Sequence, residues 1–120
     1  MKKKFMYLGV LAALFVSAMG MTSFAALATF TAKDYNPTCY VALKNTSGST
    51  RYCSVYLYQS GYSDGTNLET LGSSRDSKAN GGIVSVSKTP SKSYAYGTGM
   101  IYKGSKASTG VAKTFHKKIK

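Results

Sequence analysis

Two neighbouring stretches of the chain alternate between apolar and polar residues on either side of a turn-like centre. They are CYVALK, residues 39–44, and RYCSVYLY, residues 51–58. In both stretches the cysteine and the aliphatic residues share one parity, and in the second the tyrosines take the other. A period of two is typical of a half-buried β-strand. The intervening NTSGST is rich in turn-forming residues, so we expect the two strands to form a hairpin.

Further strands are expected later in the chain, and no apolar period of 3.6 residues follows the N-terminal segment. Gly97 and Gly99 suggest a bend or bulge within one of these strands. Residues 61–82 are polar and read as a surface connection, with at most a short strand or turn near 68–71. The expected strands are 83–89, 93–104 and 110–120, the last with a frayed basic tail. This pattern predicts an all-β fold, a small antiparallel β-sandwich or partly open barrel.

The start of the chain has the pattern of a cleaved signal peptide. KKK at residues 2–4 precedes an apolar run, 5–16, that is short for a membrane span, and SFA at 23–25 is a small-x-small cleavage site. An uncleaved membrane anchor is the alternative. We expect the mature chain to begin at Ala26, with Ala28 as a second choice, and to be secreted or associated with the envelope of a bacterial cell.

The organisation that follows is a signal peptide at 1–25, an N-terminal extension at 26–37 and a single β domain at 38–120 with a basic C-terminal tail. The full chain has 16 Lys and Arg, four Asp and Glu and one His, a formal charge of +12. Three of the lysines precede residue 26, which leaves thirteen basic and four acidic residues, or +9, on 95 residues. Such a charge favours anionic partners.

The two cysteines, Cys39 and Cys53, both lie in the mature part. In an exported protein the default expectation is a disulfide between them, with two buried free thiols as the alternative. A hairpin centred on Thr46 would align the two cysteines, whereas one residue more or fewer would leave them diagonal or bonded elsewhere.

No catalytic, metal or cofactor motif is visible, so we expect a protein that is not an enzyme and has no cofactor. His116 is the single histidine and sits in a lysine-rich terminus, where order and burial are not expected. Two cysteines and one distant histidine do not make a metal-ligand set. Nucleic acid is an unlikely partner for an exported chain whose lysines form no recognised motif, and no small-molecule substrate is indicated.

The expected partners are therefore anionic envelope polymers or a membrane surface, bound in a binding or structural role. Exposed tyrosines would supply flat contact area, unless they pack between two sheets. In overall plan, with a signal peptide, a small basic β domain and an Asn-Ser-Gly turn, the chain resembles lactococcin-type bacteriocins, which implies the alternative of a bacteriocin-like antimicrobial protein acting on competing bacteria. The candidate surface-binding residues are Tyr40, Tyr52, Tyr56, Tyr58, Lys44, Lys103, Lys113, Lys117, Lys118 and Lys120.

Overall fold

The computed structural model describes residues 26–120, so the predicted signal peptide lies outside the described residues. Across this range the chain forms seven strands and one short 3-10 helix. Among the described residues no helix is long and apolar enough to cross a membrane. The elements are β1 (Ala28–Asp34), β2 (Cys39–Asn45), β3 (Arg51–Ser60), β4 (Glu69–Lys78), β5 (Ile83–Lys88), β6 (Tyr94–Tyr102), η2 (Ala107–Thr109) and β7 (Val111–Lys118).

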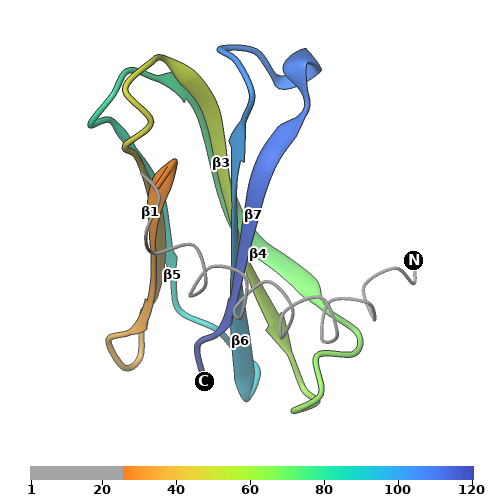
Figure 1. Cartoon of the computed structure of the whole chain (residues 1–120). Helices are drawn as coiled ribbons and strands as arrows, with labels where there is room; N and C mark the ends of the chain where they lie inside the picture. Colours follow the sequence, from red (N-terminus) through yellow and green to blue (C-terminus); the bar gives the residue numbers. More distant parts are fainter. Residues whose placement is uncertain (1–25) are drawn as a thin grey trace.

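The strands make two antiparallel sheets that pack face to face (Figure 1). One sheet has the order β1-β2-β5 and the other β4-β3-β6-β7. The core lies between them, where the aliphatic residues of β2 and β3 point towards each other. This arrangement confirms the predicted β-sandwich.

The predicted hairpin between residues 39–44 and 51–58 is wrong. Both segments are strands, but β2 pairs with β1 and β5, whereas β3 pairs with β4 and β6. The connection at 46–50 carries the chain from one sheet to the other. The two apolar faces therefore meet across the core instead of lying side by side in one sheet. Both arrangements produce the same alternation of apolar and polar residues along the sequence.

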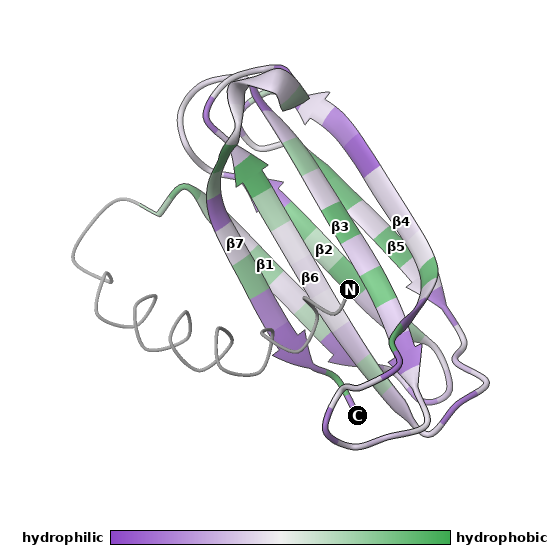
Figure 2. Ribbon diagram, turned by 90° about the vertical axis from the view of Figure 1, so that its right-hand side faces the viewer, coloured by the Kyte–Doolittle hydropathy of each residue, from purple (hydrophilic) through white to green (hydrophobic). Residues whose placement is uncertain are grey.

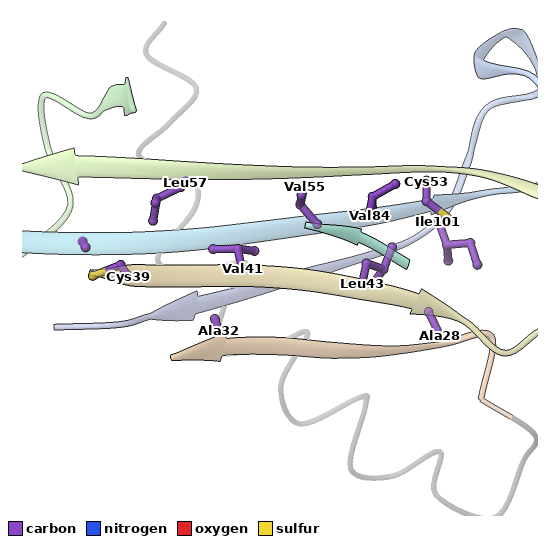
Figure 3. Close-up of a cluster of buried hydrophobic side chains, with 11 residues drawn as sticks. Ala28, Ala32, Cys39, Val41, Leu43, Cys53, Val55, Leu57, Val84 and Ile101 are labelled. Carbon is purple, nitrogen blue, oxygen red and sulfur yellow. The ribbon is translucent and has the colours of Figure 1, made fainter. Parts of the chain in front are cut away.

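The predicted disulfide is also not formed: Cys39 and Cys53 are both free and fully buried. Figure 3 shows them at opposite ends of the core, with Cys53 beside Ile101. Because β2 and β3 run in opposite directions, Cys53 is level with the far end of β2, six residues from Cys39. At about 3.3 Å per residue this is roughly 20 Å, whereas a disulfide needs Cα atoms within about 7 Å.

Burial also determines the chemistry of the two thiols. Desolvation raises the pKa of Cys39, with the charge of Asp34 adding to the increase and that of Lys120 opposing it. Desolvation likewise raises the pKa of Cys53, against the opposing charges of Lys78 and Arg51. Both side chains are therefore protonated, poorly nucleophilic parts of the core.

The sheets approach closely over β6, which has glycine at two inward-facing positions. A Cβ on Gly97 would lie 2.8 Å from Val41 Cγ2, and one on Gly99 would lie 2.7 Å from a ring carbon of Phe30. Phe30 cannot easily move aside because it stacks on Phe115, with ring centroids 5.5 Å apart. Gly97 and Gly99 therefore make room for the opposite sheet, and both pair in register with β3, so no bulge forms at these glycines.

Two regions differ from the sequence-based expectation because they are strands at the edges of sheets. Residues 69–78, expected to be mostly loop, form β4, whose exposed polar residues resemble those of a loop. Residues 28–34, placed outside the β domain, form β1. The alternation is regular on β3, where apolar and polar segments follow each other (Figure 2). The edge strand β4 lacks this signal because it has few apolar residues. Strand β1 does alternate, with Ala28, Phe30 and Ala32 at every second position, and was missed because it was assigned to the N-terminal extension.

Asn45 joins two loops at the end of β2 where the chain leaves the sheet. Its side chain is fully buried. The amide nitrogen donates to the carbonyls of Ser49 and Lys78, each at 2.8 Å, and the amide oxygen accepts from the backbone and side chain of Ser47 at 3.0 and 2.7 Å. Every polar atom of this buried amide is thus satisfied, which fixes the 46–50 and 79–82 connections relative to each other.

Replacing Gly99 by alanine tests the close approach of the sheets. We expect Gly99→Ala to lower the free energy of unfolding by about 1–3 kcal/mol, because the added methyl group must displace the Phe30 ring. Gly61→Ala is the matched control, since a Cβ there meets nothing within 4 Å, and we expect it to change stability by less than about 0.5 kcal/mol. Urea unfolding of both variants measures the difference; equal stability would contradict the packing described here.

Candidate functional site

The outer face of the β4-β3-β6-β7 sheet concentrates aromatic side chains. Successive residues of a strand point to opposite faces, so the residues that alternate with the core residues of β3 and β6 face outwards. Six of the ten tyrosines of the chain occupy these positions. We call this surface the tyrosine face; its residues are Tyr52, Ser54, Tyr56 and Tyr58 on β3, Tyr94, Tyr96, Thr98, Met100 and Tyr102 on β6, Arg75 on β4, and His116 and Lys118 on β7.

The rings of the tyrosine face contact one another. Tyr52 and Tyr102 pack edge to face, with centroids 5.0 Å apart. Tyr56 and Tyr58 are nearly parallel, with centroids 6.0 Å apart. These four side chains are half-buried, so each ring is partly covered by its surroundings and partly accessible to solvent. The sequence left open whether the tyrosines are exposed or packed between two sheets. These four rings lie on the outside of the sandwich.

One end of the tyrosine face is closed by the loop 61–67. The Tyr96 hydroxyl donates to the carbonyl of Ser63 at 2.9 Å, and the Lys118 ammonium donates to the same carbonyl at 2.9 Å. Lys118 also lies over the Tyr94 ring, 4.9 Å from its centroid. Burial under the loop raises the pKa of Tyr96, and the neighbouring charge of Asp64 contributes to the increase. Lys118 is thus an ordered part of the surface and not part of a frayed tail.

The middle of the tyrosine face is polar. Thr98 Oγ1 and His116 Nδ1 are 3.2 Å apart, and His116 is half-buried, contrary to the expectation of an exposed terminus. Desolvation lowers the pKa of His116 below its usual value of 6.5, so the ring is neutral at pH 7. Ser54 is 1% exposed and its hydroxyl has no hydrogen-bond partner among the described residues.

The charge of the tyrosine face is positive. Arg75 donates from its guanidinium group to the Tyr56 hydroxyl at 3.4 Å, and Lys118 provides a second cation. None of the four acidic residues, all of which are described, takes an outward position on these strands. Asp64, in the loop 61–67, is near Tyr96; hydrogen bonds from the backbone and side chain of Thr66 lower the pKa of its carboxyl group, and the charge of Lys118 adds to the decrease.

The structure brings together four of the ten residues proposed from the sequence for surface binding. They are Tyr52, Tyr56, Tyr58 and Lys118, all on the tyrosine face.

The other six candidates lie elsewhere. Tyr40 and Lys44 face outwards from β2 on the opposite sheet, where Tyr40 packs against Tyr35 with centroids 6.1 Å apart. Lys113 and Lys117 alternate with the outward residues of β7, and Lys113 lies 5.6 Å from the Phe115 centroid. The remaining two are Lys103, exposed directly after β6, and Lys120, whose carbonyl accepts from Ala95 at 3.0 Å.

Sequence reasoning missed several members of the tyrosine face. Tyr94, Tyr96 and Tyr102 share one parity of β6, and extending the alternation beyond the two glycines would have placed them with the β3 tyrosines. Arg75 had no such signal, because β4 was not recognised as a strand. Between them these residues supply half of the rings and one of the two cations of the surface.

Within residues 26–120 no group of three or more His, Cys, Asp or Glu side chains is arranged to hold a metal ion. Aromatic rings, hydroxyl groups and two cations suit reversible contact with an extended surface or polymer. No protein-family model matches the sequence, and no curated protein is significantly similar to it.

The lowered pKa of His116 predicts a specific pH dependence of stability. As the pH falls, His116 of the unfolded chain takes up a proton near its usual pKa of 6.5, before His116 of the folded protein does. The stability contributed by neutral His116 is therefore present above pH 6.5 and is lost as the pH falls through the lowered pKa of the folded state. We expect His116→Gln to lose less stability than the wild type between pH 7 and pH 5.

Urea unfolding at the two pH values measures this loss. An NMR titration of the single histidine provides the control, because its midpoint in the folded protein should lie below 6.5. A midpoint at or above that value would contradict the burial of the ring.

Proposed function

We propose that the protein is secreted and associates through charge with anionic surfaces of the bacterial cell envelope, in a binding or structural role. The observation that carries the proposal is the excess of cations, +9 on residues 26–120. A charge of this size on a small domain attracts anionic polymers and disfavours cationic ones. The predicted signal peptide supplies the route to the envelope.

The carboxylates of the domain offset only four of its thirteen positive charges. Two ion pairs form among the described residues, Lys92 with Glu69 at 3.0 Å and Lys78 with Asp76 at 3.7 Å. The Lys92–Glu69 pair belongs to a structural cluster, in which Gln59 donates to Glu69 at 2.9 Å and accepts from the backbone of Ser91 at 2.8 Å. Glu69 thus holds the start of β4 to the loop before β6, whereas Asp76 and Lys78 lie two residues apart on β4 itself, and most cations remain available to a partner.

The cations also surround the sandwich. Lysines project from the outer face of β2 and from both faces of β7, whose C-terminal end is strongly hydrophilic (Figure 2). A domain charged on several sides can approach an anionic surface in many orientations, which increases the rate of encounter. It does not by itself select one ligand, and the same charge would serve the bacteriocin-like alternative. A growth-inhibition assay on related bacteria separates the two, because a passive binder should not inhibit growth.

The proposal predicts that salt releases the protein from anionic material. Screening shortens the Debye length from about 10 Å at 0.1 M salt to about 3 Å at 1 M, so binding through surface charges should weaken steeply over this range. Cosedimentation with purified cell walls or anionic vesicles measures the bound fraction, with neutral vesicles as the control. Binding that is undiminished at 1 M salt, or absent at low salt, would remove the electrostatic proposal.

A further inference from the structure

Resting on the proposed function, we infer that the tyrosine face is the contact surface and that its ligand is an anionic polysaccharide, a sugar chain carrying acidic groups. The ring faces of the sugars would pack on the tyrosines, and the acidic groups would pair with Arg75 and Lys118. This assignment gives the charge-driven association a location and a chemical class of ligand.

The rings form a platform that is prepared before a ligand arrives. Tyr52 and Tyr58 are six residues apart on β3, about 20 Å at 3.3 Å per residue, which is long enough for several sugar units. The edge-to-face contact of Tyr52 with Tyr102 and the stacking of Tyr56 on Tyr58 restrict the rings. Binding therefore costs little ordering of side chains. A tyrosine ring presents an apolar face and a hydroxyl group, which complement the apolar face and the hydroxyl groups of a sugar ring.

The polar groups of the face complement an acidic sugar chain. Arg75 and Lys118 lie on opposite edge strands of the sheet, β4 and β7, so the tyrosines of β3 and β6 run between two cations. No carboxylate takes an outward position on these strands to repel the ligand. The neutral, half-buried His116 adds a hydrogen-bonding group suited to sugar hydroxyls.

A lipid surface fits this face less well. Membrane association through a protein surface relies on protruding apolar side chains as well as charge. The exposed large hydrophobic residues are spread over separate loops and strand ends, at Tyr35, Tyr62, Ile83 and Val111. None of these four belongs to the tyrosine face, whose rings are half-buried against their neighbours.

The test compares three anionic probes of different chemistry: polygalacturonate, in which each carboxylate is on a sugar ring; polyglutamate, which has carboxylates without sugar rings; and vesicles containing an anionic phospholipid. Affinities are measured at one low salt concentration. Tyr56→Ser removes a ring from the tyrosine face, and Tyr40→Ser removes a half-buried ring from the opposite sheet as its matched control. Arg75→Ala and Lys44→Ala form the corresponding pair for charge.

We expect Tyr56→Ser to weaken binding of polygalacturonate by about tenfold, as for the loss of a good aromatic contact, and to leave polyglutamate binding within about twofold. Tyr56→Phe keeps the ring and should keep the affinity. Tyr40→Ser should change neither. Arg75→Ala should weaken binding of both polymers more than Lys44→Ala does. Thermal unfolding confirms that each variant is folded, and Tyr58→Ser replaces Tyr56→Ser if the latter is not.

The outcomes separate this inference from the proposed function. Equal effects of Tyr56→Ser and Tyr40→Ser, with the wild type still binding all three probes, would overturn the assignment of the tyrosine face while the charge-driven association stands. If Tyr56→Ser weakened binding to the vesicles alone, the ligand of the tyrosine face would be a membrane, and the assignment of a polysaccharide would be overturned. Binding to none of the probes would remove the proposed function itself.

Discussion

The close approach of the two sheets over Gly97 and Gly99 is the constraint on which the rest of the structure depends. These positions on β6 face the core, and the opposite sheet fills the space with Val41 and Phe30, which would lie within 3 Å of a Cβ there. Gly72 on β4 has the same relation to Val86, at 2.8 Å. The glycines thus leave space beside Val55, Leu57 and Phe115, their inward-facing neighbours in register, into which side chains of the opposite sheet pack.

The ends of the sandwich are held by buried polar groups. Asn45 joins two loops at one end, and Gln59, 6% exposed, ties β4 to the loop before β6 at the other through Glu69 and Ser91. Both side chains are at inward-facing positions of their strands, where an unsatisfied amide would be costly. The two cysteines contribute to the same core as buried thiols, so the domain is held together by packing and hydrogen bonds without a covalent link between strands.

Most strands could be predicted from alternation, and the tyrosines of β3 could be placed on one face from the same pattern. The pairing of the strands could not be predicted from the sequence. A chain that crosses between sheets and a chain that turns back in a hairpin both place Val41 and Val55 on the core side of their strands. The edge strand β4 was the other failure: it has few apolar residues, so Arg75 was not placed beside Tyr56. Asn45 bonds locally to Ser47 and Ser49, but its bond to the carbonyl of Lys78, which joins the second loop, is distant in sequence and no local pattern indicates it.

The central claim is that β2 and β3 lie in different sheets and meet across the core. NMR measurement of nuclear Overhauser effects tests it most directly. The account predicts cross-peaks from the Hα protons of Gly99 to the ring protons of Phe30, together with backbone cross-peaks that pair β2 with β1 and β5. Backbone cross-peaks linking Cys39 with Cys53, as in an aligned hairpin, would contradict the sandwich and the surface derived from it.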